Sequence, residues 1–222
     1  MSPSPQTHEQ TFSRRMELAV KLVIAGLFLV FPALVGFAVW RESSYQALGS
    51  PVAQPIPFSH KHHVGDDGLD CRYCHTTVET SRDAGLPSTR ICLSCHSQLY
   101  ADAKVLEPLR ESARTGQPIA WRRVHTLPDF VYFAHSVHVA KGVACIECHG
   151  QVDQMPLTWR AQPLQMQWCV ACHRNPAPHL RPREQVFDMR ANSVSTEDAA
   201  ALARLMQLES RQRMTDCSTC HR

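Results

Sequence analysis

Aromatic side chains are scarce in this sequence, since Phe, Trp and Tyr together make up 7% of its 222 residues. Apolar residues of all kinds reach an ordinary 44%, but fifteen prolines interrupt the chain. Some of the apolar content also lies in one uninterrupted run near the N-terminus. The remainder holds little material for a conventional hydrophobic core, so we expect the fold to depend on large bound groups.

A strong excess of charge of one sign and unpaired cysteines are also missing. The formal net charge is +3, and there is no stripe of Lys and Arg with interleaved aromatic residues, which excludes nucleic acid as a partner. All ten cysteines fall into five Cys-x-x-Cys pairs, so none is left for a disulfide framework or a catalytic thiol.

What the sequence does contain is a Cys-x-x-Cys-His motif in five copies. The two thiols of such a motif can add to the vinyl groups of one haem, and the adjacent His then binds the iron as its proximal ligand. We therefore expect five covalently bound haem c groups, which would also supply the missing interior. The thioether bonds would explain this number of cysteines outside the cytoplasm. The cysteines are Cys71, Cys74, Cys92, Cys95, Cys145, Cys148, Cys169, Cys172, Cys217 and Cys220, and the proximal ligands are His75, His96, His149, His173 and His221.

Zinc binding is the alternative for the cysteine pairs. The spacing Cys71-x2-Cys74-x17-Cys92-x2-Cys95 fits a zinc ribbon, and the segment 145–172 nearly does. With 13 His in the chain, chance would place His after all five pairs only about once in a million. The fifth pair also lacks a second pair that would complete a tetrahedral site. Both observations favour haem.

An internal repeat supplies further histidines. The motif Phe-x-His-x-x-His begins at Phe58 and again at Phe133, and each copy precedes two of the Cys-x-x-Cys-His motifs. Histidines at i and i+3 lie on one face of a helical turn, from which they could point toward two neighbouring irons. The alternatives are an accidental surface cluster, or another metal held by the first copy and its neighbour His62. We expect His62 to face solvent or a haem propionate, and the repeated histidines to be sixth ligands: His60, His63, His135 and His138.

The last of the five motifs has no repeat of its own to supply a sixth ligand. His125 is the first choice, and His179, in a loop flanked by prolines, is another. A methionine in this position would raise the reduction potential relative to a pair of imidazoles, and an open iron is the remaining alternative. The candidate methionines are Met155, Met166, Met189, Met206 and Met214.

A run of 19 uncharged residues from Leu22 to Trp40 is long enough to cross a membrane as one helix. The basic residues Arg14, Arg15 and Lys21 precede it, which favours a cytoplasmic N-terminus and places the motifs outside. A cleaved signal peptide would have a shorter apolar region, and positive-inside charges explain the two arginines better than a twin-Arg export signal does. We expect an uncleaved, single-pass anchor.

The motifs divide a mainly α-helical chain that has extensive loops and little or no sheet. Helices are expected over residues 101–118 and, as one longer helix that presents the last haem, from Ser195 to about Met214. The Ser- and Pro-rich stretch after the apolar run is expected to be extended. The expected segments are a cytoplasmic tail (1–17), a transmembrane anchor helix (18–41), a linker (42–57), a first dihaem module with a connecting helix (58–120), a second dihaem module (121–182), and a C-terminal helix with the fifth haem (183–222).

Several stretches carry a family resemblance. They are 124–138 (VHTLPDFVYFAHSVH), 145–150, 166–174 (MQWCVACHR) and 180–182, together with the terminal CSTCH motif and the single anchor. In these features the chain resembles the pentahaem cytochrome c subunit of bacterial alternative complex III. The resemblance implies a quinol-oxidising respiratory complex in the bacterial cytoplasmic membrane, with the haem domain on the periplasmic side. The partners it implies are an iron–sulfur subunit, integral membrane subunits with the quinol site, and a monohaem cytochrome c.

Six-coordinate iron offers no position to a substrate, so the expected chemistry is outer-sphere electron transfer without an independent catalytic site. We expect a subunit that relays electrons from quinol oxidation toward a periplasmic cytochrome or a terminal oxidase. One alternative is a self-sufficient anchored quinol dehydrogenase, or an electron donor to a periplasmic reductase. Another is a multihaem enzyme that acts on a small inorganic substrate at an open iron.

Overall fold

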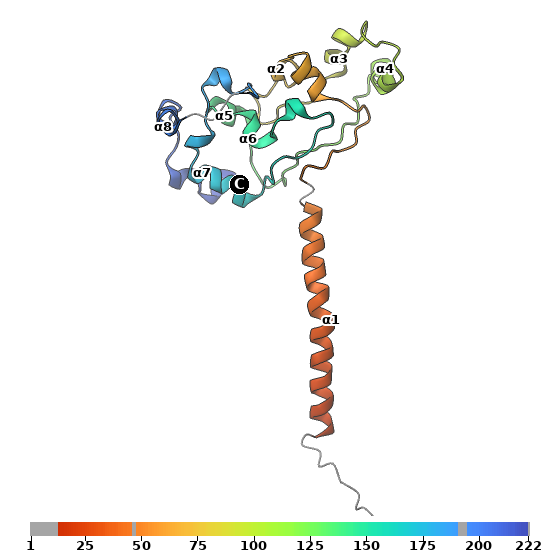
Figure 1. Cartoon of the computed structure of the whole chain (residues 1–222), viewed down its shortest axis with the longest axis vertical. Helices are drawn as coiled ribbons and strands as arrows, with labels where there is room; N and C mark the ends of the chain where they lie inside the picture. The colour runs from red at the N-terminus through yellow and green to blue at the C-terminus, as the bar shows by residue number, and fades with distance from the viewer. Residues whose placement is uncertain (1–12, 46–47, 191–194, 222) are drawn as a thin grey trace, which may run out of the picture. The chain divides into compact units, whose positions relative to one another are not determined.

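The computed structural model describes residues 13–45, 48–190 and 195–221 of the chain (Figure 1). The chain falls into two units, Met1–Ala47 and Leu48–Arg222. Within the described residues there is no β-strand, and one isolated antiparallel bridge joins Val143 to Leu180. The predicted fold class, mainly helical with extensive loops, is confirmed.

The first unit contains the predicted apolar helix. Helix α1 (Arg14–Tyr45) has a mean hydropathy of 2.7 in its apolar part, and by length and composition it is able to cross a membrane. A helix of this kind near the N-terminus serves either as a membrane anchor or as a signal sequence. The predicted cytoplasmic tail lies outside the described residues up to residue 12, and its last four residues are already helical.

The segment 42–57, which was expected to be an extended linker, is helical at its start and contacts the second unit further on. Helix α1 continues through Tyr45, and the part after residue 47 belongs to the second unit. There the side chain of Gln54 both donates to the carbonyl of Arg122 (2.8 Å) and accepts from its N–H (2.9 Å). Ile56 is buried. The prolines keep this stretch out of helices, and some of its polar groups bond to other residues of the second unit.

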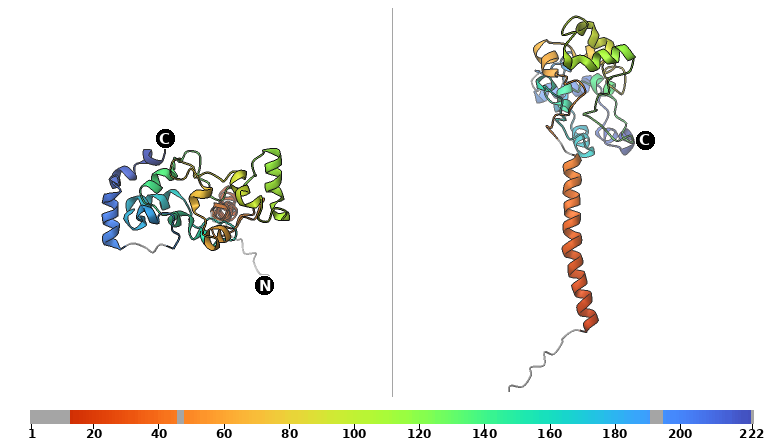
Figure 2. Two further views of the ribbon diagram at one scale, coloured as in Figure 1. Left: turned by 90° about the horizontal axis from the view of Figure 1, so that it is seen from above. Right: turned by 90° about the vertical axis from the view of Figure 1, so that its right-hand side faces the viewer.

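The second unit is built from short helices, many of which carry a Cys-x-x-Cys-His motif (Figure 2). Two of these helices are capped by the residue before the motif, since Asp70 accepts from the N–H of Arg72 and Asp216 accepts from that of Ser218. The motif helices are α2 (Cys71–Cys74), α3 (Thr89–His96), α6 (Cys145–His149), α7 (Met166–Arg174) and α10 (Cys217–Cys220). The other helices are η1 (Lys61–Asp66), η2 (Lys104–Leu106), α4 (Glu107–Thr115), α5 (His135–Ala140), η3 (Val152–Gln154), η4 (Ala177–His179), η5 (Arg183–Gln185), α8 (Thr196–Leu205) and α9 (Arg211–Met214).

The connecting helix is shorter than the predicted range 101–118. Its regular part is α4, which follows the single turn η2. Pro108 occupies the first turn of α4, where its missing N–H costs nothing. Gly116 ends the helix with a left-handed φ of 71°.

The prediction of one continuous helix from Ser195 to Met214 was wrong. Ser195 does cap α8, because its hydroxyl accepts from the N–H of Asp198 at 3.1 Å. The helix ends at Leu205, and Gln207 then adopts a left-handed φ of 49° that reverses the chain. A second serine cap begins the short helix α9. Leu205, at the end of the helix, is largely exposed, and a sequence pattern that favours a helix does not reveal a turn between two caps.

Few apolar side chains are buried in the described part of the chain. The four that are almost fully enclosed are Leu109, Met155, Leu180 and Val186, and the other buried apolar residues are Ile56, Val78, Ala144, Met189, Ala199 and Met206. A unit of this length normally needs a larger apolar interior. This scarcity fits a fold whose interior is completed by bound groups.

Gly65 lets η1 approach η3 closely, and its replacement tests that contact. A Cβ at this position would lie 2.4 Å from the carbonyl oxygen of Asp153, and the N–H of Lys61 donates to the carbonyl of Met155 at 3.1 Å. Gly65→Ala is therefore expected to lower the free energy of unfolding by about 1–3 kcal/mol, measured by chemical denaturation. The exposed His62 on the same turn provides the control, and His62→Ala should change stability by less than about 0.5 kcal/mol. Equal stabilities of the two variants would contradict the close contact.

Candidate haem-binding sites

The two Phe-x-His-x-x-His motifs adopt the same local geometry. The ring of Phe58 lies edge-on to His60, with centroids 4.9 Å apart, and faces His63 at 4.4 Å. Phe133 repeats this arrangement with its own two histidines, at 4.8 and 4.5 Å. Each phenyl ring therefore separates and orients two imidazoles. The repeated Phe was not predicted to take part in the site, although its presence in both copies of the motif was a signal for such a role.

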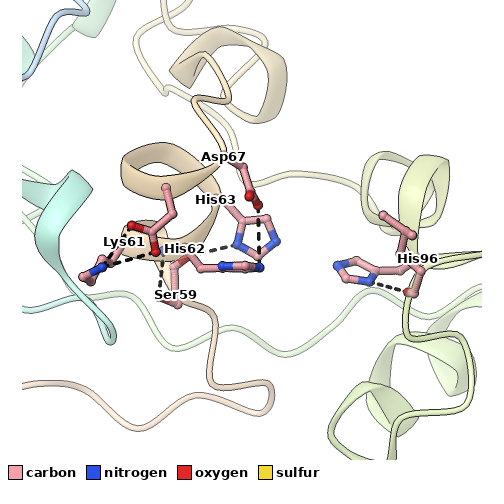
Figure 3. Close-up of polar contacts among 8 residues, drawn as sticks. Ser59, Lys61, His62, His63, Asp67 and His96 are labelled. Atoms are coloured by element: carbon pink, nitrogen blue, oxygen red, sulfur yellow. Dashed lines mark hydrogen bonds and ion pairs between the residues drawn. The ribbon is translucent and has the colours of Figure 1, made fainter.

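Each repeated histidine lies opposite the proximal histidine of one Cys-x-x-Cys-His motif, as Figure 3 shows for His63 and His96. Two imidazoles on one metal ion have centroids about 6.3 Å apart, because each metal–nitrogen bond is about 2 Å and a ring nitrogen lies about 1.1 Å from its centroid. The four pairs therefore have the spacing of axial ligands on either side of one iron. The centroid distances are 6.5 Å for His60 and His75, 6.1 Å for His63 and His96, 6.3 Å for His135 and His149, and 6.1 Å for His138 and His173.

Hydrogen bonds to the backbone orient most of these rings. A carbonyl oxygen only accepts, so an Nδ1 atom bonded to it carries the proton, and Nε2 keeps its lone pair for a metal. His60 differs, because its Nδ1 lies 2.9 Å from the hydroxyl of Thr158. Backbone carbonyls lie 2.7–2.9 Å from Nδ1 of His63, His75, His96, His135, His138 and His173, and 3.2 Å from Nδ1 of His221.

Burial favours the neutral, metal-binding form of three histidines, namely His60, His138 and His149. It lowers the pKa of His60 to about 4 and that of His149 to about 3, with neighbouring histidines adding to the effect. It also lowers the pKa of His138. A neutral imidazole is the ligand that iron requires, so no proton has to be displaced near neutral pH.

The thiols are not arranged as a zinc site. None of the ten cysteines forms a disulfide. Burial raises the pKa of Cys145 and of Cys148 to about 12, which disfavours the thiolate that zinc binds. In the described part of the chain, no group of three or more His, Cys, Asp or Glu side chains is placed to hold a bare metal ion. The thiols and the paired histidines therefore fit a haem, with its iron between the two histidines of a pair, better than they fit a bare metal ion.

The five motifs follow one another in space in the order second, first, third, fourth and fifth. The hydroxyl groups of Tyr73 and Ser94 are hydrogen-bonded at 2.7 Å and join the first motif to the second. Three cysteines have a thiol of another motif close enough to raise their pKa, in addition to the effect of burial. The pairs are Cys145 with Cys71, Cys148 with Cys172, and Cys169 with Cys220. Figures 1 and 2 show the same succession across the second unit, from α3 through α2 and α6 to α7.

His125, the first choice for the sixth ligand of the last motif, lies beside a different motif. Its ring contacts His149 with centroids 4.4 Å apart, and its buried Nε2 atom has no hydrogen-bond partner. That distance is too short for the two rings to bind one iron from opposite sides. The ring of His221 instead faces Phe130, with centroids 5.8 Å apart.

His179, the other histidine offered for that position, belongs to a charged cluster. Its Nδ1 atom lies 2.7 Å from the carboxylate of Glu147. The same carboxylate accepts from the buried guanidinium of Arg181 at 3.0 Å. The cluster was not anticipated, because Glu147 stands between two cysteines of a motif and its partners come from a distant loop.

Most candidate methionines serve as packing or backbone partners. Met155, Met189 and Met206 are buried in the core, and the carbonyl of Met214 accepts from Nδ1 of His173 at 2.8 Å. Met166 differs from them, since its side chain is 70% exposed in the first turn of α7.

Comparison with known proteins points in the same direction. Residues 131–222, which contain the second repeat and the last three motifs, match the family of cytochrome c7 and related cytochromes c. Over 122 residues, 54% of this chain, the sequence is 38% identical to the multihaem cytochrome c subunit of a menaquinone reductase from Nitratidesulfovibrio vulgaris. The chain spans about half the length of that relative, 55%. Residues 131–222 therefore form a cytochrome c7-like domain, and over about half of its length the chain is similar to a multihaem c-type cytochrome.

Proposed function

We propose that this chain is an electron-relay subunit of a quinone-linked membrane complex and that it carries five covalent haem c groups. The observation that supports this most directly is the unbroken spatial series of motifs, four of which have a paired histidine at axial spacing. When bound, haem supplies one-electron redox chemistry, and its axial ligands tune the potential.

The residues of the chain divide this work among them. The cysteine pairs would hold the haems covalently, and at four motifs the paired histidines would bind the iron from both sides and leave no position for a substrate. Phe58 and Phe133 each contact the two distal imidazoles of one repeat, and backbone carbonyls fix the protonation of all of these imidazoles except His60, which lies against the hydroxyl of Thr158. The assembly is therefore suited to outer-sphere transfer rather than to bond chemistry.

A count of haems tests the proposal. The mass of the purified full-length chain should exceed that of the polypeptide by five haem groups, and a haemochrome assay should give the same number. Resonance Raman and EPR spectra should show four irons with two imidazole ligands. A colourless protein, or one that contains zinc in place of iron, would overturn the assignment.

We propose a methionine, Met166, as the sixth ligand of the last motif in place of His125. Apart from the four pairs and His221, three described histidines remain, and each has a neighbour other than His221. Asp67 is the neighbour of His62, His149 that of His125, and Glu147 that of His179. Met166 is exposed on the helix of the fourth motif, whose Cys169 adjoins Cys220. Met166→Ala should then remove the spectrum of one methionine-ligated iron, and Met166→His should convert it to a bis-imidazole spectrum.

The direction of electron flow separates two candidate complexes. We favour oxidation of quinol in a complex like alternative complex III, with an iron–sulfur subunit, integral membrane subunits and a monohaem cytochrome c, from which electrons pass to a periplasmic cytochrome or a terminal oxidase. The name of the relative, a menaquinone reductase subunit, supports the reverse direction as the second candidate. In either case α1 would anchor the chain in the bacterial cytoplasmic membrane, with its N-terminus inside and the motifs on the periplasmic side.

The intact complex decides between the two directions. Purified from its native membrane, it should reduce added cytochrome c at the expense of a quinol. Reduction of menaquinone by a reduced cytochrome, without the opposite reaction, would favour the second candidate. Turnover of quinol by the isolated chain would contradict a pure relay.

A further inference from the structure

The two dihaem modules exchange the groups that orient their first distal histidines. Nδ1 of His60, in the first module, lies 2.9 Å from Oγ1 of Thr158, in the second. Nδ1 of His135, in the second module, lies 2.8 Å from the carbonyl oxygen of Arg82, in the first. Each module therefore provides the hydrogen-bond acceptor for a proposed iron ligand of the other.

From this exchange we propose that Thr158 is a positioning residue, which sets the reduction potential of the iron held between His60 and His75. The proposal rests on the bis-imidazole coordination put forward above. Among the proposed axial histidines whose Nδ1 partner is described, His60 is the one whose partner is a side chain, that of Thr158. The others have backbone carbonyls as partners.

The backbone of Thr158 is itself held in place. Its carbonyl accepts from the N–H of Val52 at 3.2 Å, and the N–H of Gly49 donates to the carbonyl of Arg160 at 3.0 Å. Residues 49–52, which belong to the expected linker 42–57, therefore hold in place the loop that carries the Thr158 hydroxyl. A β-branched side chain has few rotamers, so a fixed backbone places Oγ1 reproducibly against the imidazole.

The hydroxyl acts on the iron through the imidazole. When Nδ1–H donates to Oγ1, the ring becomes a stronger electron donor, which favours the oxidised iron and lowers the potential. Removal of the oxygen leaves the half-buried Nδ1–H of His60 unpaired and lets the ring turn. The potential should then rise, and the distal ligand should be easier to displace.

The experiment uses the haem-loaded, full-length protein and compares Thr158→Val with Thr158→Ser. Valine keeps the shape and removes the hydroxyl, whereas serine keeps the hydroxyl. Thr80→Val, at an exposed position in the loop after the first motif, is the matched control. In a spectroelectrochemical titration, Thr158→Val should move one haem to a more positive potential. Cyanide should bind to one haem about 10–100-fold more tightly, and both Thr158→Ser and Thr80→Val should resemble the wild type.

Two outcomes would overturn the inference. One is a Thr158→Val protein with an unchanged titration and unchanged cyanide affinity. The other is an equal shift of all haems, which would indicate a general change in packing. Should the valine variant fail to incorporate haem, Thr158→Ala is measured instead against the same criteria.

His60→Ala separates this inference from the proposed coordination. That variant should contain one high-spin iron. If it contains none, the bis-imidazole assignment of the first motif fails. If His60→Ala behaves as expected while the Thr158 variants without the hydroxyl do not differ from the wild type, only the role of Thr158 fails.

Discussion

Replacement of His138 by alanine is expected to convert one low-spin iron to high spin while every haem stays attached. Its ring lies opposite His173 with centroids 6.1 Å apart, and the two rings have the spacing of axial ligands. The thioether bonds and His173 would still hold the group, but the sixth position would be vacant. EPR and visible spectra would detect the new high-spin iron, and the mass of the protein would show that haem is retained.

The exposed His62 provides the matched control for this experiment. Its imidazole lies 3.6 Å from the carboxylate of Asp67, on the surface of the turn that also carries the proposed distal ligand His63 (Figure 3). His62→Ala should leave all irons low-spin. An unchanged spectrum in His138→Ala would remove His138 from the ligands, and a high-spin iron in His62→Ala would show that the turn, rather than a ligand, had been disturbed.

A chain that receives no haem is expected to lose cooperative unfolding altogether. The buried apolar side chains of the described second unit are too few to stabilise a domain of this size alone. Binding free energy of the haems would then be part of the folding free energy, as in small metal-dependent domains. A variant with all ten cysteines changed to serine should show no sigmoidal transition by circular dichroism, whereas the loaded protein should.

A partial variant gives the contrast that this prediction needs. One group that joins the last motif to the rest is the N–H of Tyr132, which donates to the carbonyl of Cys220 at 2.8 Å. Cys217→Ser with Cys220→Ser should therefore lose one haem and retain a cooperative transition. Cooperative unfolding of the fully unloaded chain would contradict a haem-filled interior.

Local patterns of residues were sufficient for much of the candidate site. The five motifs, the apolar helix and the repeated His60, His63, His135 and His138 could all be recognised because each depends on a few consecutive residues. The expectation of little or no sheet followed from the many prolines and turn residues, and the described residues contain no strand. The structure keeps these features and places the four repeated histidines at the spacing of axial ligands.

The tertiary structure decided which groups meet. The pairing of His60 with the first motif and of His63 with the second depends on how a π-helical turn docks on a loop of the other module. His125 lies against His149 rather than beside the last motif, because the route of an irregular loop between helices leaves no periodic signal in the sequence. Thr158 likewise reaches His60 across 98 positions of the chain. Consecutive residues are sufficient to predict the cofactor chemistry. Which side chains lie beside each histidine depends on contacts between segments that are distant in the chain.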